Sequence, residues 1–270
     1  MKSSVVNGKH IAGRIIEDLT KSYSKLPHKA CLGLLVMNPD FATQKFLNIK
    51  RKIANTLGVQ LIEKELKDAV QTADVLAVLS QLVQETDGVI VQLPLAGQID
   101  TEKVLAAIPA SHDVDGIGSG KGEVLSPVVG AIAEILDHES QLLFGKKVVI
   151  VGKGKLVGEP AARWFEGQGS DVVLVGKSDN VASQTIDADI IVLGAGTPGL
   201  LTPDMIKDGA VILDAGTSES GGKLAGDADP SLEQKARLFT PVPGGIGPVA
   251  VAMIFKNLLS LIQRNLSNKA

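Results

Sequence analysis

The stretch that decides the fold is KVVIVGKGKLVGEP, residues 147–160. Its apolar and mostly β-branched run, Val148 to Val151, is typical of a buried parallel strand. The glycines that follow let the backbone approach a bulky anion, and the helix predicted after them points its N–H groups toward it. Pro160 fits the first turn of that helix, where a missing N–H costs nothing. The Gly-x-Gly-x-x-x-Gly spacing departs by one residue from Gly-x-Gly-x-x-Gly, so an ordinary strand–helix turn remains an alternative.

Three later segments, 172–176, 189–194 and 210–216, also read as apolar strands ending in glycine. Because the carboxyl ends of parallel strands meet at one edge of a sheet, these glycines favour a dinucleotide-binding domain. Lys177 and Ser178 stand where an acidic residue would accept the ribose hydroxyls of NAD. A cation and a hydroxyl suit a 2′-phosphate, so NADP is the predicted cofactor and NAD the alternative.

The first half of the chain repeats the strand–helix rhythm. We predict strands over 31–36 and 61–66, and a helix over 43–57 that is stopped by Gly58. On a helical wheel, the apolar stripe of that helix is Phe46, Ile49, Ile53 and Leu57. Lys50 falls inside this stripe. A lysine on a buried face is either a side chain that snorkels to the edge or a functional amine.

Two further polar positions follow apolar segments. Residues 87–95 predict a strand that closes on Gln92, at the end of the sheet where open α/β folds bind ligands; the alternative is a plain loop residue. Asp113 and Asp115 lie in a loop with the spacing of a calcium site. Calcium is excluded because Ile117 and Val124 would occupy its fifth and twelfth positions. We predict no metal site.

Residues 240–248, TPVPGGIGP, predict a stiff turn with no side chains in the way of a flat ring. The helix predicted over 249–265 has a broad apolar face that can pack back on the first domain. The domain crossing is placed near the helix that starts at Ser126.

Length and composition set the broad class. A chain of 270 residues is long enough for two domains, each with its own core. The net charge of −3 favours neither a disordered tail nor a nucleic-acid surface. The single cysteine, Cys31, excludes an internal disulfide and fits a reducing compartment. Without a signal peptide or an uncharged apolar run of membrane-spanning length, we expect a soluble cytoplasmic protein with no membrane or nucleic-acid partner.

Over nearly its whole length the chain resembles the bifunctional methylenetetrahydrofolate dehydrogenase/methenyltetrahydrofolate cyclohydrolase family, FolD. The runs that carry the resemblance are residues 46–52, 87–95, 113–116, 152–160 and 240–248. It implies a homodimer of two α/β domains flanking a cleft. The folate-binding catalytic domain would span 1–120, completed by a helix at 250–270, and a Rossmann-type NAD(P)-binding domain would span 121–249. It also implies NADP-dependent oxidation of 5,10-methylenetetrahydrofolate to the methenyl form, and hydrolysis of that cation to 10-formyltetrahydrofolate.

Carried over position by position, the resemblance implies catalytic roles for three residues. Lys50 matches the catalytic lysine, Gln92 its partner, and Asp115 the aspartate that holds the pterin. The predicted substrate-binding residues are Phe46, Pro243, Gly244 and Gly245. The predicted cofactor-binding residues are Gly152, Lys153, Gly154, Val157, Gly158, Lys177, Ser178 and Thr217.

Lys50 is the candidate base for the hydrolysis, in which water attacks a cationic carbon and loses a proton. Its reference pKa of about 10.4 must fall by about three units, roughly 4 kcal/mol, for a neutral amine near pH 7. The apolar stripe, Arg51, Lys52 and the cationic substrate are expected to lower it. Alternatively, Lys50 stays charged and orients water and folate. Asp115 is expected to accept hydrogen bonds from the pterin, whereas an Asx-turn role suits Asp113 better.

The sequence departs from the family's pattern at four places. Phe46 replaces a tyrosine, Gly154 a serine and Ala250 a threonine, while 126–129 replaces Pro-Cys-Thr-Pro. The missing hydroxyls bear on cofactor affinity and on the balance of the two activities, so an enzyme with a single activity is one alternative. A dehydrogenase acting on amino acids or shikimate is a second, opposed by the strand ending at Gln92. A dinucleotide sensor without turnover is a third, opposed by the buried amine of Lys50.

Overall fold

The computed structural model describes residues 4–67, 70–118, 124–220 and 223–268. The chain folds into two compact units. The three-stranded unit comprises residues 13–127 and 251–270, and the six-stranded unit comprises residues 1–12 and 128–250. The predicted domain boundary between residues 120 and 121 lies outside the described residues.

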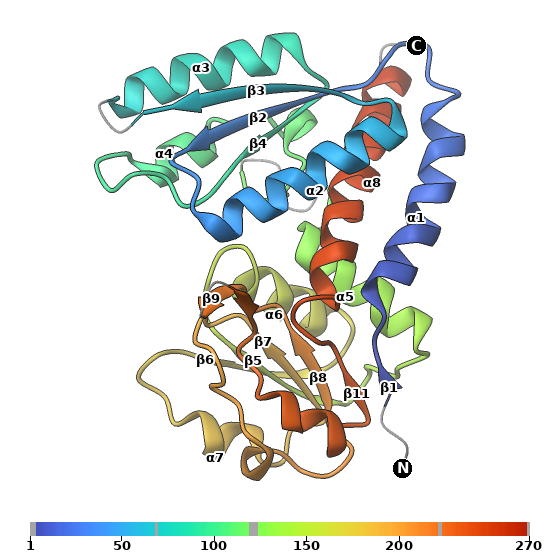
Figure 1. The fold of residues 1–270 in the computed structure, drawn as a ribbon, viewed down its shortest axis with the longest axis vertical. Helices are drawn as coiled ribbons and strands as arrows, with labels where there is room; N and C mark the ends of the chain where they lie inside the picture. Colours follow the sequence, from blue (N-terminus) through green and yellow to red (C-terminus); the bar gives the residue numbers. More distant parts are fainter. Residues whose placement is uncertain (1–3, 68–69, 119–123, 221–222, 269–270) are drawn as a thin grey trace. The chain divides into compact units, whose positions relative to one another are not determined.

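The three-stranded unit contains a parallel sheet in the order β3-β2-β4 (Figure 1). Its strands are β2 (Cys31–Met37), β3 (Gln60–Leu66) and β4 (Gly88–Val91), and its helices include α2 (Phe41–Leu57), α3 (Thr72–Glu85) and α4 (Thr101–Ala106). A short 3-10 turn, Ala110–His112, follows α4. Alternate residues of β2 enter different cores. Leu32 and Leu34 pack with α2, whereas Leu35 and Met37 pack with α3, which is why this strand is apolar without interruption.

Helix α2 carries Lys50 and begins two residues earlier than predicted. The side chain of Asp40 accepts a hydrogen bond from the Thr43 backbone N–H and caps the helix, and Gly58 ends it in a left-handed conformation with φ 71°. The buried face is rotated from the predicted stripe. Ile49, expected inside, is 36% exposed, whereas Lys50 is only 6% exposed.

The six-stranded unit contains a parallel sheet in the order β1-β11-β8-β7-β5-β6 (Figure 1). Its strands are β1 (Ser4–Val5), β5 (Lys147–Val151), β6 (Asp171–Val175), β7 (Ile190–Leu193), β8 (Val211–Asp214) and β11 (Leu238–Phe239). Its helices include α5 (Pro127–His138), α6 (Gly158–Gly167) and α7 (Val181–Thr185). Two 3-10 turns, Pro203–Met205 and Pro230–Gln234, and an antiparallel pair, β9 (Ser218–Ser220) with β10 (Lys223–Ala225), complete it. The strand order reverses at β5, which has β6 on one side and β7 on the other, and such a reversal is where doubly wound sheets bind ligands.

Helices α1 (Gly8–Tyr23) and α8 (Ile246–Ser267) each contain residues of both units. By length and composition α8 is apolar enough to cross a membrane, but 67% of its apolar window is buried inside the structure. Val251, Phe255 and Leu258 belong to the core that also contains β2 and α2. The Tyr23 hydroxyl of α1 donates a hydrogen bond of 2.7 Å to the Phe255 carbonyl oxygen. We therefore assign this part of α8 to the core of the three-stranded unit.

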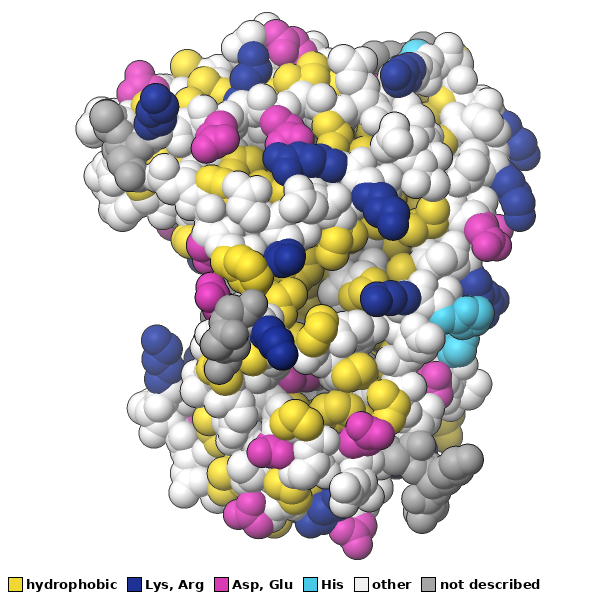
Figure 2. All heavy atoms as spheres, viewed as in Figure 1, with side chains coloured by type: hydrophobic (Ala, Val, Ile, Leu, Met, Phe, Trp, Pro, Cys, Tyr) yellow, Lys and Arg dark blue, Asp and Glu magenta, His cyan; other side chains and the backbone are white. Residues whose placement is uncertain are grey.

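Charged side chains of both signs are interspersed over the face shown in Figure 2. Ion pairs among the described residues include Arg51 with Glu63 at 2.6 Å and Lys207 with Asp189 at 2.7 Å. Exposed pairs of this kind each contribute little to the free energy of unfolding, so the fold rests mainly on its apolar cores.

Candidate active site

A buried lysine forms the centre of the site in the three-stranded unit. The Lys50 Nζ donates a hydrogen bond of 2.8 Å to Oε1 of Gln92. Helix α2 carries the lysine, and Gln92 directly follows the carboxyl end of β4. The Gln92 Nε2 donates to the Leu93 carbonyl oxygen at 3.2 Å, which leaves the amide oxygen facing the lysine. The amine therefore has a fixed direction.

Burial and neighbouring charges act on Lys50 in opposite directions. Burial lowers the pKa of the Lys50 amine, while the carboxylates of Asp115 and Glu63 raise it, with burial the larger effect. The contributions expected of Arg51 and Lys52 are not found: the Arg51 guanidinium forms hydrogen bonds of 2.8 and 2.6 Å with Glu63, and Lys52 is exposed. The charge near the lysine is thus negative, and desolvation alone favours the neutral amine.

Two aspartates near Lys50 have different environments. Asp113 is 1% exposed, and its Oδ2 accepts a hydrogen bond of 2.7 Å from the Gly118 backbone N–H, so it holds the loop. Asp115 is half-buried. Burial raises the pKa of Asp115 to about 6, the Lys50 charge lowers it and the Asp113 charge raises it. One turn before Lys50 on α2, Phe46 is half-buried and packs against the core.

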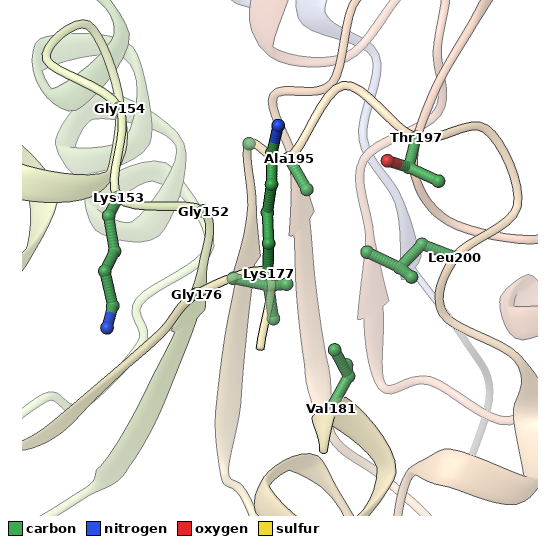
Figure 3. Close-up of a pocket in the computed structure, with 11 residues that line it drawn as sticks. Gly152, Lys153, Gly154, Gly176, Lys177, Val181, Ala195, Thr197 and Leu200 are labelled. Carbon is green, nitrogen blue, oxygen red and sulfur yellow. The ribbon is translucent and has the colours of Figure 1, made fainter. Parts of the chain in front are cut away.

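A pocket of about 580 Å³ lies at the carboxyl ends of β5, β6 and β7 in the six-stranded unit. Its lining includes Gly152, Lys153 and Gly154 after β5, Gly176 and Lys177 after β6, and Gly194, Ala195, Thr197 and Leu200 after β7. Figure 3 shows Lys153 on one side, Thr197 and Leu200 on the other, and Lys177 between them. Four of the eleven lining residues are glycines, which bring backbone close to the pocket, and Lys153 and Lys177 place two cations in its lining.

Close backbone packing requires most of these glycines. Gly152 has φ 110°, and a Cβ added to Gly158 would overlap the Gly152 carbonyl oxygen. A Cβ added to Gly194 would lie 2.7 Å from Cγ1 of Val157. By contrast, a Cβ on Gly154 would meet nothing within 4 Å. Gly152, Gly158 and Gly194 thus shape the loop, whereas Gly154 leaves an open space.

Family models match both halves of this arrangement. The model of the tetrahydrofolate dehydrogenase/cyclohydrolase catalytic domain matches residues 6–115, and the model of its NAD(P)-binding domain matches residues 127–266. The chain belongs to the tetrahydrofolate dehydrogenase/cyclohydrolase family. This membership agrees with the resemblance inferred from the sequence motifs.

Individual relatives align over nearly the whole chain. The bifunctional protein FolD of Campylobacter hominis is 32% identical, covering 97% of this chain and 98% of the relative. The bifunctional protein FolD of Staphylococcus aureus strain bovine RF122 / ET3-1 is 34% identical, covering 96% of each. Among solved structures, Trypanosoma brucei FolD complexed with NADP cofactor and inhibitor has a TM-score of 0.93 at 27% identity, covering 98% of this chain and 99% of that one.

Four of the eight predicted cofactor-binding residues line the pocket of this family member: Gly152, Lys153, Gly154 and Lys177. Val157 and Gly158 pack behind it. Ser178 and Thr217 are exposed and are not part of the lining. The sequence interpretation missed Val181, Ala195, Thr197 and Leu200. The position of Ala195 and Thr197 just after a predicted strand ending in glycine was the signal that could have found them.

An ion pair joins the pocket residue Lys153 to Asp179. The Lys153 Nζ lies 3.6 Å from Oδ2 of Asp179, which also accepts a hydrogen bond of 2.7 Å from the Gly176 backbone N–H. Lys177 is exposed beside them. The two lysines thus provide cations beside the glycine loop, and the Asp179 carboxylate already contacts one of them.

The predicted Pro-Gly-Gly turn precedes α8. Gly244 has φ 115°, and its carbonyl oxygen accepts a hydrogen bond of 2.9 Å from the Gly8 backbone N–H. A Cβ on Gly245 would lie 2.7 Å from the Pro241 carbonyl oxygen. Pro243 is exposed at the tip of the turn. Among the described residues, no cluster of three or more His, Cys, Asp and Glu side chains is placed to hold a metal.

Proposed function

We propose that this chain carries out both reactions of a bifunctional folate enzyme. It oxidises 5,10-methylenetetrahydrofolate to 5,10-methenyltetrahydrofolate with NADP, and it hydrolyses the methenyl cation to 10-formyltetrahydrofolate. The observation that carries the proposal is the buried Lys50 amine, bonded to Gln92 at 2.8 Å and electrostatically coupled to Asp115. A protein that only senses a dinucleotide has no use for such an amine.

The hydrolysis uses the amine as a base. Because one Lys50 N–H donates to Gln92, the lone pair of the neutral amine is free to accept a proton from water. The water oxygen bonds to the methenyl carbon, and the proton passes to Nζ. The C–N5 bond of the tetrahedral adduct then breaks, its electron pair goes to N5, and the ammonium returns its proton there. The hydroxyl proton leaves to solvent, so the products are 10-formyltetrahydrofolate and one proton.

The carboxylate of Asp115 orients the folate in this scheme. A carboxylate accepts paired hydrogen bonds from the amino group and ring N–H of a pterin, which are donors on one edge. Phe46, on the same helix as Lys50, offers an aromatic face for stacking. These contacts place the reacting carbon beside the amine, which is the part of catalysis that positioning provides.

The pocket of the six-stranded unit fits NADP by its donor set. The backbone of Gly152 and Gly154 can approach the pyrophosphate, and the ammonium groups of Lys153 and Lys177 suit the 2′-phosphate. When bound, NADP accepts a hydride from the folate methylene group. The chain's own task is to bind both rings and exclude water, because hydride transfer needs no acid or base. At the turn before α8, the open space beside Gly244, where a Cβ would meet nothing within 4 Å, suits a flat ring.

The test replaces the lysine and follows each reaction separately. Lys50→Met should reduce hydrolysis of methenyltetrahydrofolate by a factor of about 10² to 10⁴, the usual contribution of a general base. Methenyl absorbance without cofactor measures this step. Lys52→Met, two positions along the same helix at an exposed lysine, should behave as the parent. Hydrolysis by Lys50→Met at the parent rate would remove the lysine from the mechanism.

We also propose that the chain is a cytoplasmic homodimer. The resemblance to FolD supports the dimer, and the single cysteine, Cys31, suits a reducing compartment. Light scattering on the purified protein measures the assembly directly, and a monomer mass at micromolar concentration would contradict it.

A further inference from the structure

Two aspartates with no part in the scheme above are buried beneath the pocket loops. Asp214 ends β8 and is 2% exposed, and Asp227 follows β10 and is 0% exposed. Within the described parts of the chain, neither forms an ion pair with a lysine, arginine or histidine. Buried carboxylates without a cation are rare because desolvation is costly, so their partners need an explanation.

The partners of Asp227 are three consecutive backbone N–H groups of the loop after β7. Its Oδ2 accepts hydrogen bonds from Ala195 at 2.7 Å and Gly196 at 3.0 Å, and its Oδ1 accepts one from Thr197 at 2.7 Å. Ala195 and Thr197 line the pocket. A single carboxylate therefore fixes the conformation of the loop that forms one pocket wall.

Asp214 in turn fixes Asp227. Its Oδ1 accepts from the Gly216 N–H at 2.8 Å and the Asp227 N–H at 3.2 Å, and its Oδ2 accepts from the Ala228 N–H at 2.8 Å. Burial raises the pKa of Asp214 to about 6, and the neighbouring Asp227 charge acts in the same direction. A Cβ on Gly216 would crowd the Asp227 carboxylate, which explains a glycine there.

The direction of these N–H groups determines what the loop presents on its outer side. In a trans peptide the carbonyl oxygen points opposite to the N–H group of the next residue. Because the three N–H groups point inward to Asp227, the carbonyl oxygens of Gly194, Ala195 and Gly196 point away from it. The Gly194 oxygen packs against Gly152, so the wall after β7 offers the Ala195 and Gly196 oxygens as acceptors. Acceptors suit hydroxyl and carboxamide N–H donors and repel phosphate, whereas the loop after β5 carries N–H groups and Lys153.

We propose that Asp227 is a positioning residue of the dehydrogenase. By holding the N–H groups of the Gly194–Thr197 loop, it makes the outer side of that loop a wall of hydrogen-bond acceptors. This wall would bind the nicotinamide riboside of the dinucleotide, which carries hydrogen-bond donors and no 2′-phosphate. Asp214 supports this loop through Asp227. The inference rests on the proposed function only in its choice of NADP as the ligand. It assigns Lys153 and the loop after β5 to the phosphates and the loop after β7 to the nicotinamide riboside.

Asp227→Asn tests the assignment, because the amide keeps the shape but replaces one acceptor oxygen by a donor NH₂. At least one of the three N–H groups then loses its partner, and the loop must turn. NADP should bind about tenfold more weakly, the usual effect of one unmet hydrogen bond. The fragment 2′,5′-ADP, which lacks the nicotinamide riboside, should bind as to the parent. Calorimetric titration measures both, and Asp208→Asn, at a side chain that is 93% exposed, is the matched control.

Two results would overturn the assignment: parental NADP affinity in Asp227→Asn, or equal losses for NADP and 2′,5′-ADP. Equal losses would mean that the carboxylate only maintains the unit. Parental binding of 2′,5′-ADP shows that the six-stranded unit of the variant is folded, and cofactor-free hydrolysis of methenyltetrahydrofolate reports on the three-stranded unit. If Asp227→Asn does not fold, Asp214→Asn should give a smaller loss with the same selectivity. If the parent had no dehydrogenase activity, the proposed function would be contradicted. The NADP and 2′,5′-ADP affinities would still test the role of Asp227, because binding is measured without turnover.

Discussion

The candidate sites of the two units differ in which parts of the chain form them. In the three-stranded unit, the chemistry depends on three side chains: burial shifts the pKa of Lys50 and of Asp115, and Gln92 fixes the direction of the lysine. In the six-stranded unit, the pocket is lined by the loops after three strands, four of its eleven lining residues are glycines, and the side chains of Asp179 and Asp227 act from outside the lining. Moving a proton requires an ionisable group with a tuned pKa, whereas binding a long anionic ligand requires close approach of many N–H groups. The first site should therefore be sensitive to side-chain chemistry, and the second to added volume.

The largest expected effect outside the Lys50 position is at Gly158. A Cβ there overlaps the Gly152 carbonyl oxygen, and neither backbone can retreat without moving the loop. Gly158→Ala should raise the KM for NADP by roughly 100-fold, because several loop N–H contacts are lost together, and should leave cofactor-free hydrolysis intact. Gly167→Ala, in the same helix but outside the pocket lining, is the matched control, because its Cβ would meet nothing within 4 Å. Steady-state kinetics of both reactions checks this, and equal KM values for the two variants would contradict the role of close packing.

A side-chain substitution in the three-stranded unit should weaken folate binding and leave NADP binding unchanged. Asp115→Asn keeps the size but removes the charge that pairs with pterin donors. Folate should bind about tenfold or more weakly, as expected for the loss of charge-assisted hydrogen bonds, and NADP should bind as to the parent. Titration with each ligand separates the two. Parallel losses for both ligands would show a folding defect instead.

The same substitution has a signature in the pH dependence of stability. Burial raises the pKa of Asp115 to about 6, above its unfolded value, so the folded state holds more protons between about pH 4 and about pH 6. The free energy of unfolding of the parent should therefore fall, relative to Asp115→Asn, as the pH rises through this window. Urea unfolding of both proteins at about pH 4.5 and about pH 6.5 measures the difference. A constant difference would show that Asp115 titrates as it does in the unfolded chain.

The protonation of Lys50 should separate the two activities by pH. Burial lowers the pKa of the amine, and only its neutral form accepts a proton from water. Hydride transfer requires no such form. At saturating substrates, the ratio of hydrolysis to oxidation should therefore fall as the pH is lowered from about 8 to about 6. A ratio that stays constant would support the alternative in which Lys50 remains charged and only orients water.

Features of the fold and the site could be predicted from the sequence where the interacting residues are close together along the chain, and not where they are far apart. The burial of Lys50 followed from helical periodicity, but the exact face did not, because Asp40 fixes the start of α2 and Ile49 is turned outward. The glycine loop was readable because strand, turn and helix are adjacent in sequence. The bonds from Asp227 to the Ala195 loop were not, since they join a side chain to backbone some thirty residues away. An aspartate in the run Gly226-Asp227-Ala228 resembles an ordinary turn residue.

The smallest expected effect concerns the choice of cofactor. Asp179 contacts Lys153 at 3.6 Å, so a 2′-phosphate that binds this lysine must share it with a carboxylate. The pair is exposed, and solvent screens such pairs strongly, so the effect of Asp179 on phosphate binding is expected to be small. Asp179→Asn should therefore raise kcat/KM with NADP by about two- to fivefold and leave the value with NAD nearly unchanged. Asp208→Asn, exposed in the same unit, should leave both values unchanged. A gain with NAD equal to that with NADP would mean that Asp179 acts on the pocket as a whole, and the two cations would then have no selective role in recognising the phosphate.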